Sequence, residues 1–177
     1  DKLLCIPGFL SENGDREEEL LRMRENLRSL CRYAAGKGVT VTLEDFDREN
    51  APYADTAGLR YFLDAIPELR LTFDTGNFRF AGEDERAAYE ALRTSVVHVH
   101  AKDRAAAGFA GGPATISRTG EALYPCAVGS GMLHIRAVLE RLKADGYEGF
   151  VTIEHFRVRD MRTAVRQSAD WLRSVVG

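Results

Sequence analysis

The stretch Val97-His98-Val99-His100 guides the interpretation of this chain, because it alternates apolar and polar residues and ends on a side chain that can bind a metal ion. Three other stretches have the same form: Val41-Thr42-Leu43-Glu44, Leu71-Thr72-Phe73-Asp74 and Val151-Thr152-Ile153-Glu154. Alternation of this kind is typical of β-strands, in which residues two apart share a face. The sequence therefore predicts four strands that each end on a metal-ligand type of residue.

Each predicted strand has one polar and one apolar face. A parallel sheet that is covered on both sides normally has two apolar faces. Here one face becomes polar at the C-terminal end of every strand, where a (β/α) barrel places its reactive groups. The polar pairs are Thr42/Glu44, Thr72/Asp74, His98/His100 and Thr152/Glu154, and the apolar pairs, expected to pack against helices, are Val41/Leu43, Leu71/Phe73, Val97/Val99 and Val151/Ile153.

Helical patterns alternate with these strands along the chain. Alternating strands and helices indicate a parallel sheet of right-handed β-α units. The stretch 104–130 is rich in Gly and Ala and contains two prolines, so we expect a long loop that covers the mouth of the site. The expected strands are 3–6, 41–44, 71–74, 97–100 and 149–154, and the expected helices are 15–35, 56–66, 83–93, 133–144 and 160–176.

Five strands are fewer than the eight of a closed barrel, which typically needs ~250 residues. An open doubly wound sheet also fits the number of strands. Such a sheet, however, usually binds its ligand at one crevice, to which only a few strands contribute residues. Four successive strands with ligand-type ends fit a barrel mouth better. We therefore predict an α/β fold, a (β/α)8 TIM barrel present as an N-terminally incomplete barrel of about five β-α units. Residues 1–177 would form a single domain, the C-terminal five-eighths of the barrel.

Composition excludes several classes of protein. A net charge of −3 without a dense basic run gives no signature of nucleic-acid binding. No stretch approaches the ~20 apolar residues that span a bilayer, and no signal-peptide pattern opens the chain. The three cysteines are widely spaced, which argues against a disulfide framework and a thiolate zinc site. We expect a reducing, cytoplasmic setting with no nucleic-acid or membrane partner.

The side chains of the four strand-end residues together suit a metal ion. Three converging carboxylates, Glu44, Asp74 and Glu154, would repel one another and raise their pKa values. A divalent cation removes this conflict by supplying the largest local charge. Three oxygen donors and the imidazole of His100 favour Mn²⁺, with Mg²⁺ or Co²⁺ as alternatives. An ion of this kind can polarise a carbonyl, and a neighbouring carboxylate can then move a proton at the adjacent carbon.

Several motifs occur in a defined order: Leu43-Glu44, Phe73-Asp74-Thr75-Gly76-Asn77, His98-Val99-His100-Ala101-Lys102-Asp103, Gly129-Ser130-Gly131, and Gly146-Tyr147-Glu148-Gly149 followed by Thr152-Ile153-Glu154-His155. In this combination the chain resembles the xylose isomerase-like TIM-barrel superfamily, the sugar phosphate isomerase/epimerase group. The resemblance covers nearly the whole chain, from the fourth barrel unit to the C-terminus. Each motif alone is a weak signal, and the ordered set is fairly specific.

The resemblance implies roles for individual residues. Glu44, Asp74, His100 and Glu154 would be the metal ligands, and Glu44 and Glu154 would also act as acid and base through a metal-held enediolate. Lys102 would reach a substrate oxygen, or else pair with a carboxylate of the site. His98, like Lys102, is assigned to substrate binding. By strand alternation it lies deeper in the barrel than His100, where it would either hydrogen-bond a metal ligand or be a core residue with its hydrogen bonds satisfied.

Two departures from the family pattern narrow the function. Many epimerases and the related abasic-site endonucleases carry His three residues after the aspartate, where this chain has Asn77. The endonucleases also use a three-zinc cluster with an Asp-x-His after the His strand, which Asp103-Arg104-Ala105 does not supply. A role in DNA repair is therefore not expected, and the epimerase subgroup stays open.

Other candidate residues have structural explanations. His134 is expected to be structural, and His155 to face outward and anchor a helix or loop. Arg157 and Arg159 fit either a substrate phosphate or carboxylate or, as the favoured alternative, solvated loop charges. Gly129-x-Gly131 before a helix fits a phosphate cradle or a tight turn.

Two classes of function follow. The first is a metal-dependent isomerase or epimerase of a ketose or a related sugar or polyol carbonyl, with a keto-inositol dehydratase-type lyase as a close variant. The second is a non-catalytic barrel fragment that serves as a binding scaffold. The expected partner is a small-molecule sugar or sugar-like substrate, and a homo-oligomer would cover unpaired sheet edges.

Overall fold

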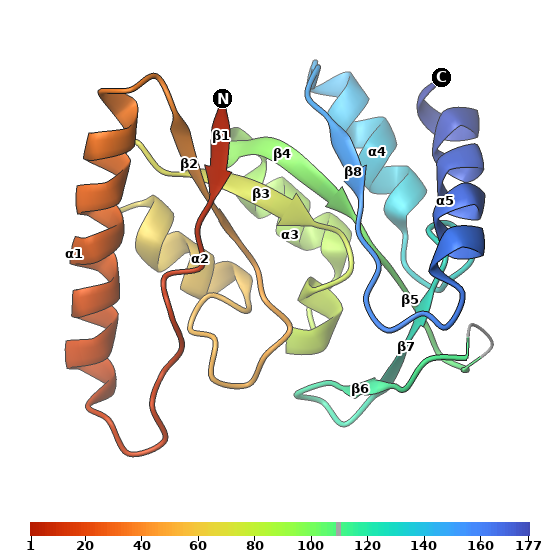
Figure 1. Ribbon diagram of the computed structural model, residues 1–177, viewed down its shortest axis with the longest axis horizontal. Helices are drawn as coiled ribbons and strands as arrows, with labels where there is room; N and C mark the ends of the chain where they lie inside the picture. Colours follow the sequence, from red (N-terminus) through yellow and green to blue (C-terminus); the bar gives the residue numbers. More distant parts are fainter. Residues whose placement is uncertain (109–110) are drawn as a thin grey trace.

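The computed structural model describes residues 1–108 and 111–177, and its centre is a curled sheet of five parallel strands (Figure 1). All neighbouring strands run parallel, and their order in the sheet follows their order in the chain. A doubly wound sheet would reverse its order at a switch point. The curled half-barrel therefore confirms the predicted incomplete TIM barrel. The strands are β1 (Lys2–Leu4), β2 (Thr40–Glu44), β3 (Arg70–Asp74), β4 (Val96–Ala101) and β8 (Val151–Ile153).

Helices cover the outer side of this sheet (Figure 1). Asp15 and Asp160 cap the first and last of them by accepting hydrogen bonds from backbone N–H groups. The predicted helices are confirmed, although the helix expected over 56–66 ends at Leu63. Among the described residues, no helix is long and apolar enough to cross a membrane. The α-helices are α1 (Arg16–Ala35), α2 (Thr56–Leu63), α3 (Glu85–Leu92), α4 (Ile135–Ala144) and α5 (Met161–Val176), with short 3-10 helices η1 (Phe78–Ala81) and η2 (Arg93–Ser95).

The core lies between the sheet and the helices. Leu43, Leu71, Phe73 and Val99 are fully buried there, which confirms the apolar faces predicted for β2, β3 and β4. Fully burying side chains of this size stabilises the fold by about 1.5–3 kcal/mol each. Val97, Val151 and Ile153 are only half-buried. On the other face, the Thr72 hydroxyl donates a 2.8 Å hydrogen bond to the Thr42 hydroxyl, so these buried polar side chains are satisfied.

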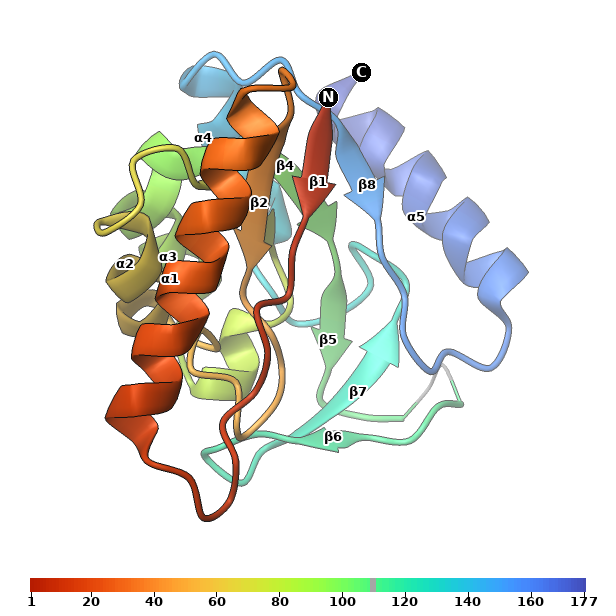
Figure 2. The same cartoon turned by 60° about the vertical axis from the view of Figure 1, so that its left-hand side comes forward.

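The prediction that 104–130 is a loop is wrong in part. Three short strands form a small antiparallel sheet in the order β5-β7-β6, beyond the C-terminal ends of β4 and β8 (Figure 2). Strands this short carry no readable alternation, and pairing with one another stabilises them. Residues 109–110 of the expected loop lie outside the described residues. The strands are β5 (Asp103–Ala105), β6 (Thr115–Ile116) and β7 (Ala122–Cys126).

Candidate metal centre

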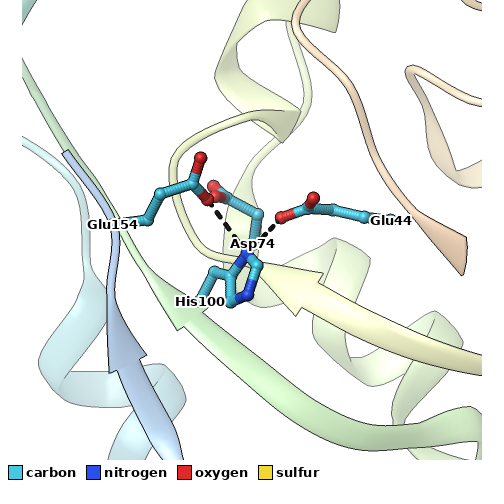
Figure 3. Close-up of side chains that lie close together, drawn as sticks. All are labelled: Glu44, Asp74, His100 and Glu154. Carbon is cyan, nitrogen blue, oxygen red and sulfur yellow. Dashed lines mark hydrogen bonds and ion pairs between the residues drawn. The ribbon is translucent and has the colours of Figure 1, made fainter. Parts of the chain in front are cut away.

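Four side chains from four neighbouring strands converge at the C-terminal ends of the sheet (Figure 3). Glu44 and Asp74 end β2 and β3, His100 lies near the end of β4, and Glu154 directly follows β8. The parallel register sets Asp74 beside His100. Each residue offers one ligand atom, and all of these atoms lie within 4.8 Å of one another. The structure thus brings together the four residues that strand alternation singled out.

The imidazole of His100 lies between the two glutamates. Its Nδ1 is 2.5 Å from Glu44 Oε1 and 2.9 Å from Glu154 Oε2 (Figure 3). Burial lowers the pKa of His100, but the adjacent carboxylates of Glu154 and Glu44 outweigh burial and raise it to about 10. Burial raises the pKa of Glu154, but the adjacent His100 imidazole and the charge of Lys102 bring it below its ordinary value. Without a metal, His100 is therefore a cation at neutral pH and Glu154 is ionised.

The two oxygens of the buried Asp74 carboxylate have different surroundings. Oδ1 accepts hydrogen bonds from the backbone N–H groups of Gly76, at 2.7 Å, and Asn77, at 2.9 Å. Oδ2 lies 3.0 Å from the Lys102 ammonium. Burial raises the pKa of Asp74 to about 7 against the opposing charge of Lys102. Oδ1 therefore anchors the carboxylate, and Oδ2 is left for the charged groups of the site.

Lys102 is the buried cation of the site. Its ammonium lies 3.1 Å from both Glu154 Oε1 and Asn77 Oδ1, in addition to the ion pair with Asp74. Burial lowers the pKa of this ammonium, but the charges of Asp74 and Glu154 outweigh burial and raise it above its ordinary value. Lys102 thus pairs with carboxylates of the site, which is one of the two roles that the sequence suggested for it.

The donor set fits a divalent cation. It combines three carboxylates and one imidazole, a set suited to ions of the Mn²⁺ and Mg²⁺ type. Among the described residues, the buried atoms Asp74 Oδ2 and Glu154 Oε2 accept no hydrogen bond, although each is in ion-pair range of a cation. Donors at about 2.0–2.3 Å from one ion lie at most roughly 4.6 Å apart, and the ligand atoms of the four residues lie within 4.8 Å of one another.

Sequence reasoning missed two charged residues that support the site. Asp45 is fully buried behind Asp74, whose backbone N–H donates to Asp45 Oδ1 at 3.2 Å. Burial, with the negative charge of Asp74, raises the pKa of Asp45. Arg104 is buried as well and pairs with Asp47 at 2.5 Å, while its guanidinium donates to Asn77 Oδ1 at 3.4 Å. The position of Asp45 directly after a strand-end ligand was a usable signal, whereas no local pattern marks Arg104.

The other three histidines have different surroundings. His98 is half-buried; its Nε2 lies 3.1 Å from the Thr152 hydroxyl, and its ring contacts that of His100 edge to face. His155 Nε2 lies 2.9 Å from the Ser168 hydroxyl on α5, which confirms the predicted helix anchoring. His134 directly precedes α4, and its Nδ1 lies 3.0 Å from Glu85 Oε1; its structural role stays a prediction.

The Gly129-x-Gly131 segment is a tight turn and not an open phosphate cradle. The backbone N–H groups of Gly129 and Gly131 donate to Asp103 Oδ2, at 2.9 and 3.0 Å. A side chain of this protein thus already occupies the anion position. Gly131 also has no room for a side chain, since an added Cβ would lie 2.2 Å from Asp103 Oδ1. The tight-turn interpretation is confirmed.

A cavity of about 470 Å³ adjoins the four converging side chains. A cavity of this size is sufficient for a small ligand. Thr115 of β6 contributes to its wall, so the small antiparallel sheet does border the site as expected of this region. The lining residues are Glu44, Phe46, Asp47, Arg48, Asn77, Lys102, Thr115, Glu154, Phe156 and Arg157.

Fold and site together define a β/α-barrel protein with a cluster of ligand-type side chains at the C-terminal mouth. Comparison with known families gives the particular group: the xylose isomerase-like TIM barrel model matches residues 1–175. The chain belongs to this family.

Individual relatives are longer than this chain. It is 29% identical over 170 residues to the 3-dehydro-D-guloside 4-epimerase of Escherichia coli (strain K12), covering 93% of this chain and 55% of that protein. The apo crystal structure of 3-keto-D-glucoside 4-epimerase from E. coli superposes with a TM-score of 0.69 at 25% identity, over 93% of this chain and 57% of that one. A xylose isomerase-like TIM barrel protein from Mycobacterium smegmatis, solved in complex with magnesium, shares the fold with a TM-score of 0.71 at 16% identity. The match covers 95% of this chain and 54% of that one. The chain thus spans little more than half the length of these relatives.

Proposed function

We propose that Glu44, Asp74, His100 and Glu154 bind one divalent metal ion, with Mn²⁺ favoured and Mg²⁺ or Co²⁺ as alternatives. The support is the convergence of their ligand atoms within 4.8 Å and the two buried carboxylate oxygens without hydrogen bonds. The magnesium in one structural relative agrees with an oxygen-rich site. When bound, the ion would polarise a substrate carbonyl and neutralise part of the carboxylate charge.

We infer that the chain carries the site of an isomerase or epimerase acting on a ketose or a related sugar or polyol carbonyl. The observation that carries this proposal is the position of the two glutamates. Glu44 and Glu154 come from the first and last of the four strands and flank His100 on either side. Two carboxylates on opposite sides of one carbon can remove a proton from one face and return it to the other. The similarity to sugar 4-epimerases points to the same reaction class.

Four residues of this chain have distinct roles in the proposed proton transfer. Glu154 has a lowered pKa and is ionised, so it can accept a proton at the carbon next to the carbonyl. Glu44 supplies the second carboxyl group at the opposite side. Lys102 has a raised pKa and stays cationic, so it can donate a hydrogen bond to a substrate oxygen. His98 lies one layer deeper and supports the His100 ring through edge-to-face contact.

Exchange of a substrate proton for deuterium tests this proposal directly. The Mn²⁺-loaded chain would be incubated in D₂O with a panel of ketoses, and loss of the proton next to the carbonyl would be followed by NMR. We expect exchange with at least one ketose, and a loss of about 10²–10⁴-fold in Glu44→Gln and in Glu154→Gln. Glu140→Gln, an exposed residue of α4, is the matched control. Metal binding without any exchange would instead favour the scaffold hypothesis.

A cytoplasmic location and a homo-oligomer stay predictions from the sequence. The proposed partner is a small sugar or sugar-like molecule, in line with the sugar substrates that the names of the relatives state.

A further inference from the structure

The cavity beside the candidate metal centre is lined by positively charged as well as negatively charged side chains. Arg48 and Arg157 line it together with Glu44 and Glu154. Most arginines around the site are paired: Arg104 binds Asp47, and Arg118 binds Asp55. Within residues 1–108 and 111–177, the guanidinium groups of Arg48 and Arg157 form neither an ion pair nor a hydrogen bond. In the described part of the chain they are therefore the cavity-lining arginines that lack an ion-pair partner.

Both guanidinium groups are held on aromatic rings. Arg48 lies over the ring of Phe9, 4.6 Å from its centroid, and Arg157 lies over Phe156 at 5.1 Å. Stacking occupies the flat face of a guanidinium and leaves the N–H groups at its edge free to donate. These N–H groups can bind the paired oxygens of a phosphate or carboxylate. Among the described residues, the N–H groups of Arg48 and Arg157 are thus available to donate to a ligand.

The backbone at Arg157 supports a ligand-binding role independently. Arg157 has a φ of +65°, the one positive φ of a residue other than glycine in the described part of the chain. Residues with a side chain avoid this conformation, and where it persists it clusters at ligand sites. The surroundings enforce it: a Cβ added to Gly112 would lie 2.0 Å from the Arg157 carbonyl oxygen, so the two backbones are in close contact. The strained conformation positions an unpaired cation on the wall of the cavity, three residues after Glu154.

We propose that the substrate is an anionic sugar, whose phosphate or carboxylate group binds Arg48 and Arg157 while its carbonyl end reaches Glu44 and Glu154. This inference rests on the proposed function, because it adds a substrate class to the same site. A phosphate and a carboxylate share the relevant chemistry, namely a negative charge spread over several acceptor oxygens. A neutral sugar would leave both guanidinium groups without a partner.

Calorimetric binding to the Mn²⁺-loaded chain tests the proposal with three probes: D-fructose, D-fructose 6-phosphate and D-glucuronate. We expect at least one anionic probe to bind about tenfold or more tightly than D-fructose. Arg48→Ala and Arg157→Gly should each remove most of that preference. Glycine adopts the φ of residue 157 without strain, so Arg157→Gly removes the guanidinium and keeps the backbone. Arg159→Ala is the matched control, because Arg159 is exposed nearby and does not line the cavity.

The outcomes separate the two proposals. Preference for the phosphate probe alone would identify a sugar phosphate, and preference for the carboxylate alone a sugar acid; both support an anion site. Equal affinity for all three probes would overturn the anion site. An anion preference that survives both substitutions would overturn it as well, because the anion would then bind the Mn²⁺ directly. A Mn²⁺ titration of each variant completes the test. A chain that binds no Mn²⁺ but still prefers anions through the two arginines would contradict the metal site and support the anion site.

Discussion

The ammonium group of Lys102 lies 3.0 Å from Asp74 Oδ2, inside the cluster of carboxylates that is proposed to hold a metal ion. The same group is 3.1 Å from Glu154 Oε1. Without a divalent cation, Lys102 and the protonated His100 together offset the negative charge of the three carboxylates. A metal ion bound as proposed would therefore compete with these two cations for the same oxygens.

Removal of one ligand should abolish tight metal binding. Asp74→Asn keeps the size of the side chain but removes the charge from a residue whose Oδ2 has no hydrogen bond. Loss of a partner outside the ligand set typically costs 10–100-fold in metal affinity, so loss of a ligand should cost more than about 100-fold. Titration calorimetry with Mn²⁺ would show one site in the wild-type chain and in Glu140→Gln, and no measurable site in Asp74→Asn. Equal affinity in all three chains would mean that the four residues hold no metal.

Metal affinity should increase with pH. His100, with a pKa of about 10, carries a proton at neutral pH and must lose it to bind a metal; Asp74, with a pKa of about 7, loses its own proton near neutrality. Binding therefore releases protons, and mass action makes it stronger as pH rises. We expect the binding constant to increase about tenfold per pH unit between pH 8 and 9, and more steeply below pH 7. Calorimetry at pH 6, 7, 8 and 9 measures the slope, and a pH-independent constant would contradict the protonated state of His100.

Lys102→Met should have opposite effects on the metal-free and the metal-bound chain. Removing one partner of a buried ion pair typically costs about 3–5 kcal/mol, because the other charge is left uncompensated. The metal-free variant should therefore unfold at lower urea concentration, while Mn²⁺ binds more tightly since a competing cation is gone. Urea unfolding with and without Mn²⁺ gives both quantities. Lys143→Met, an exposed lysine of α4, should change neither.

The tight turn before α4 should not tolerate a methyl group. A Cβ at Gly131 would lie 2.2 Å from Asp103 Oδ1 and 2.4 Å from the Arg104 carbonyl oxygen. Overpacking of this kind costs about 1–3 kcal/mol of stability. Gly36→Ala is the control, because an added Cβ there has ordinary contacts and the residue has helical φ and ψ. We expect a clear decrease in melting temperature for Gly131→Ala and no decrease for Gly36→Ala; similar values for both would contradict the close contact.

Local patterns were sufficient for most of the barrel. Alternation along β2, β3 and β4 correctly predicted both their apolar faces and the polar residues at their C-terminal ends. The helices expected over 15–35 and 160–176 begin as predicted, and Asp15 and Asp160 cap their first turns; such capping depends on neighbouring residues alone. The small sheet over 103–126 could not be predicted in this way. Its strands are two to five residues long, and β5 pairs with β7 across the intervening β6 segment.

By itself, the sequence determined which residues stand at the ends of the barrel strands, because side-chain alternation is a property of the local backbone. Only the tertiary structure decided how their charges are balanced. It inserted Lys102 between Asp74 and Glu154, set Arg104 against Asp47, and filled the Gly129-x-Gly131 turn with the Asp103 carboxylate. These partners lie tens of residues apart in sequence, and the burial that makes an unpaired charge costly exists only once the chain has folded.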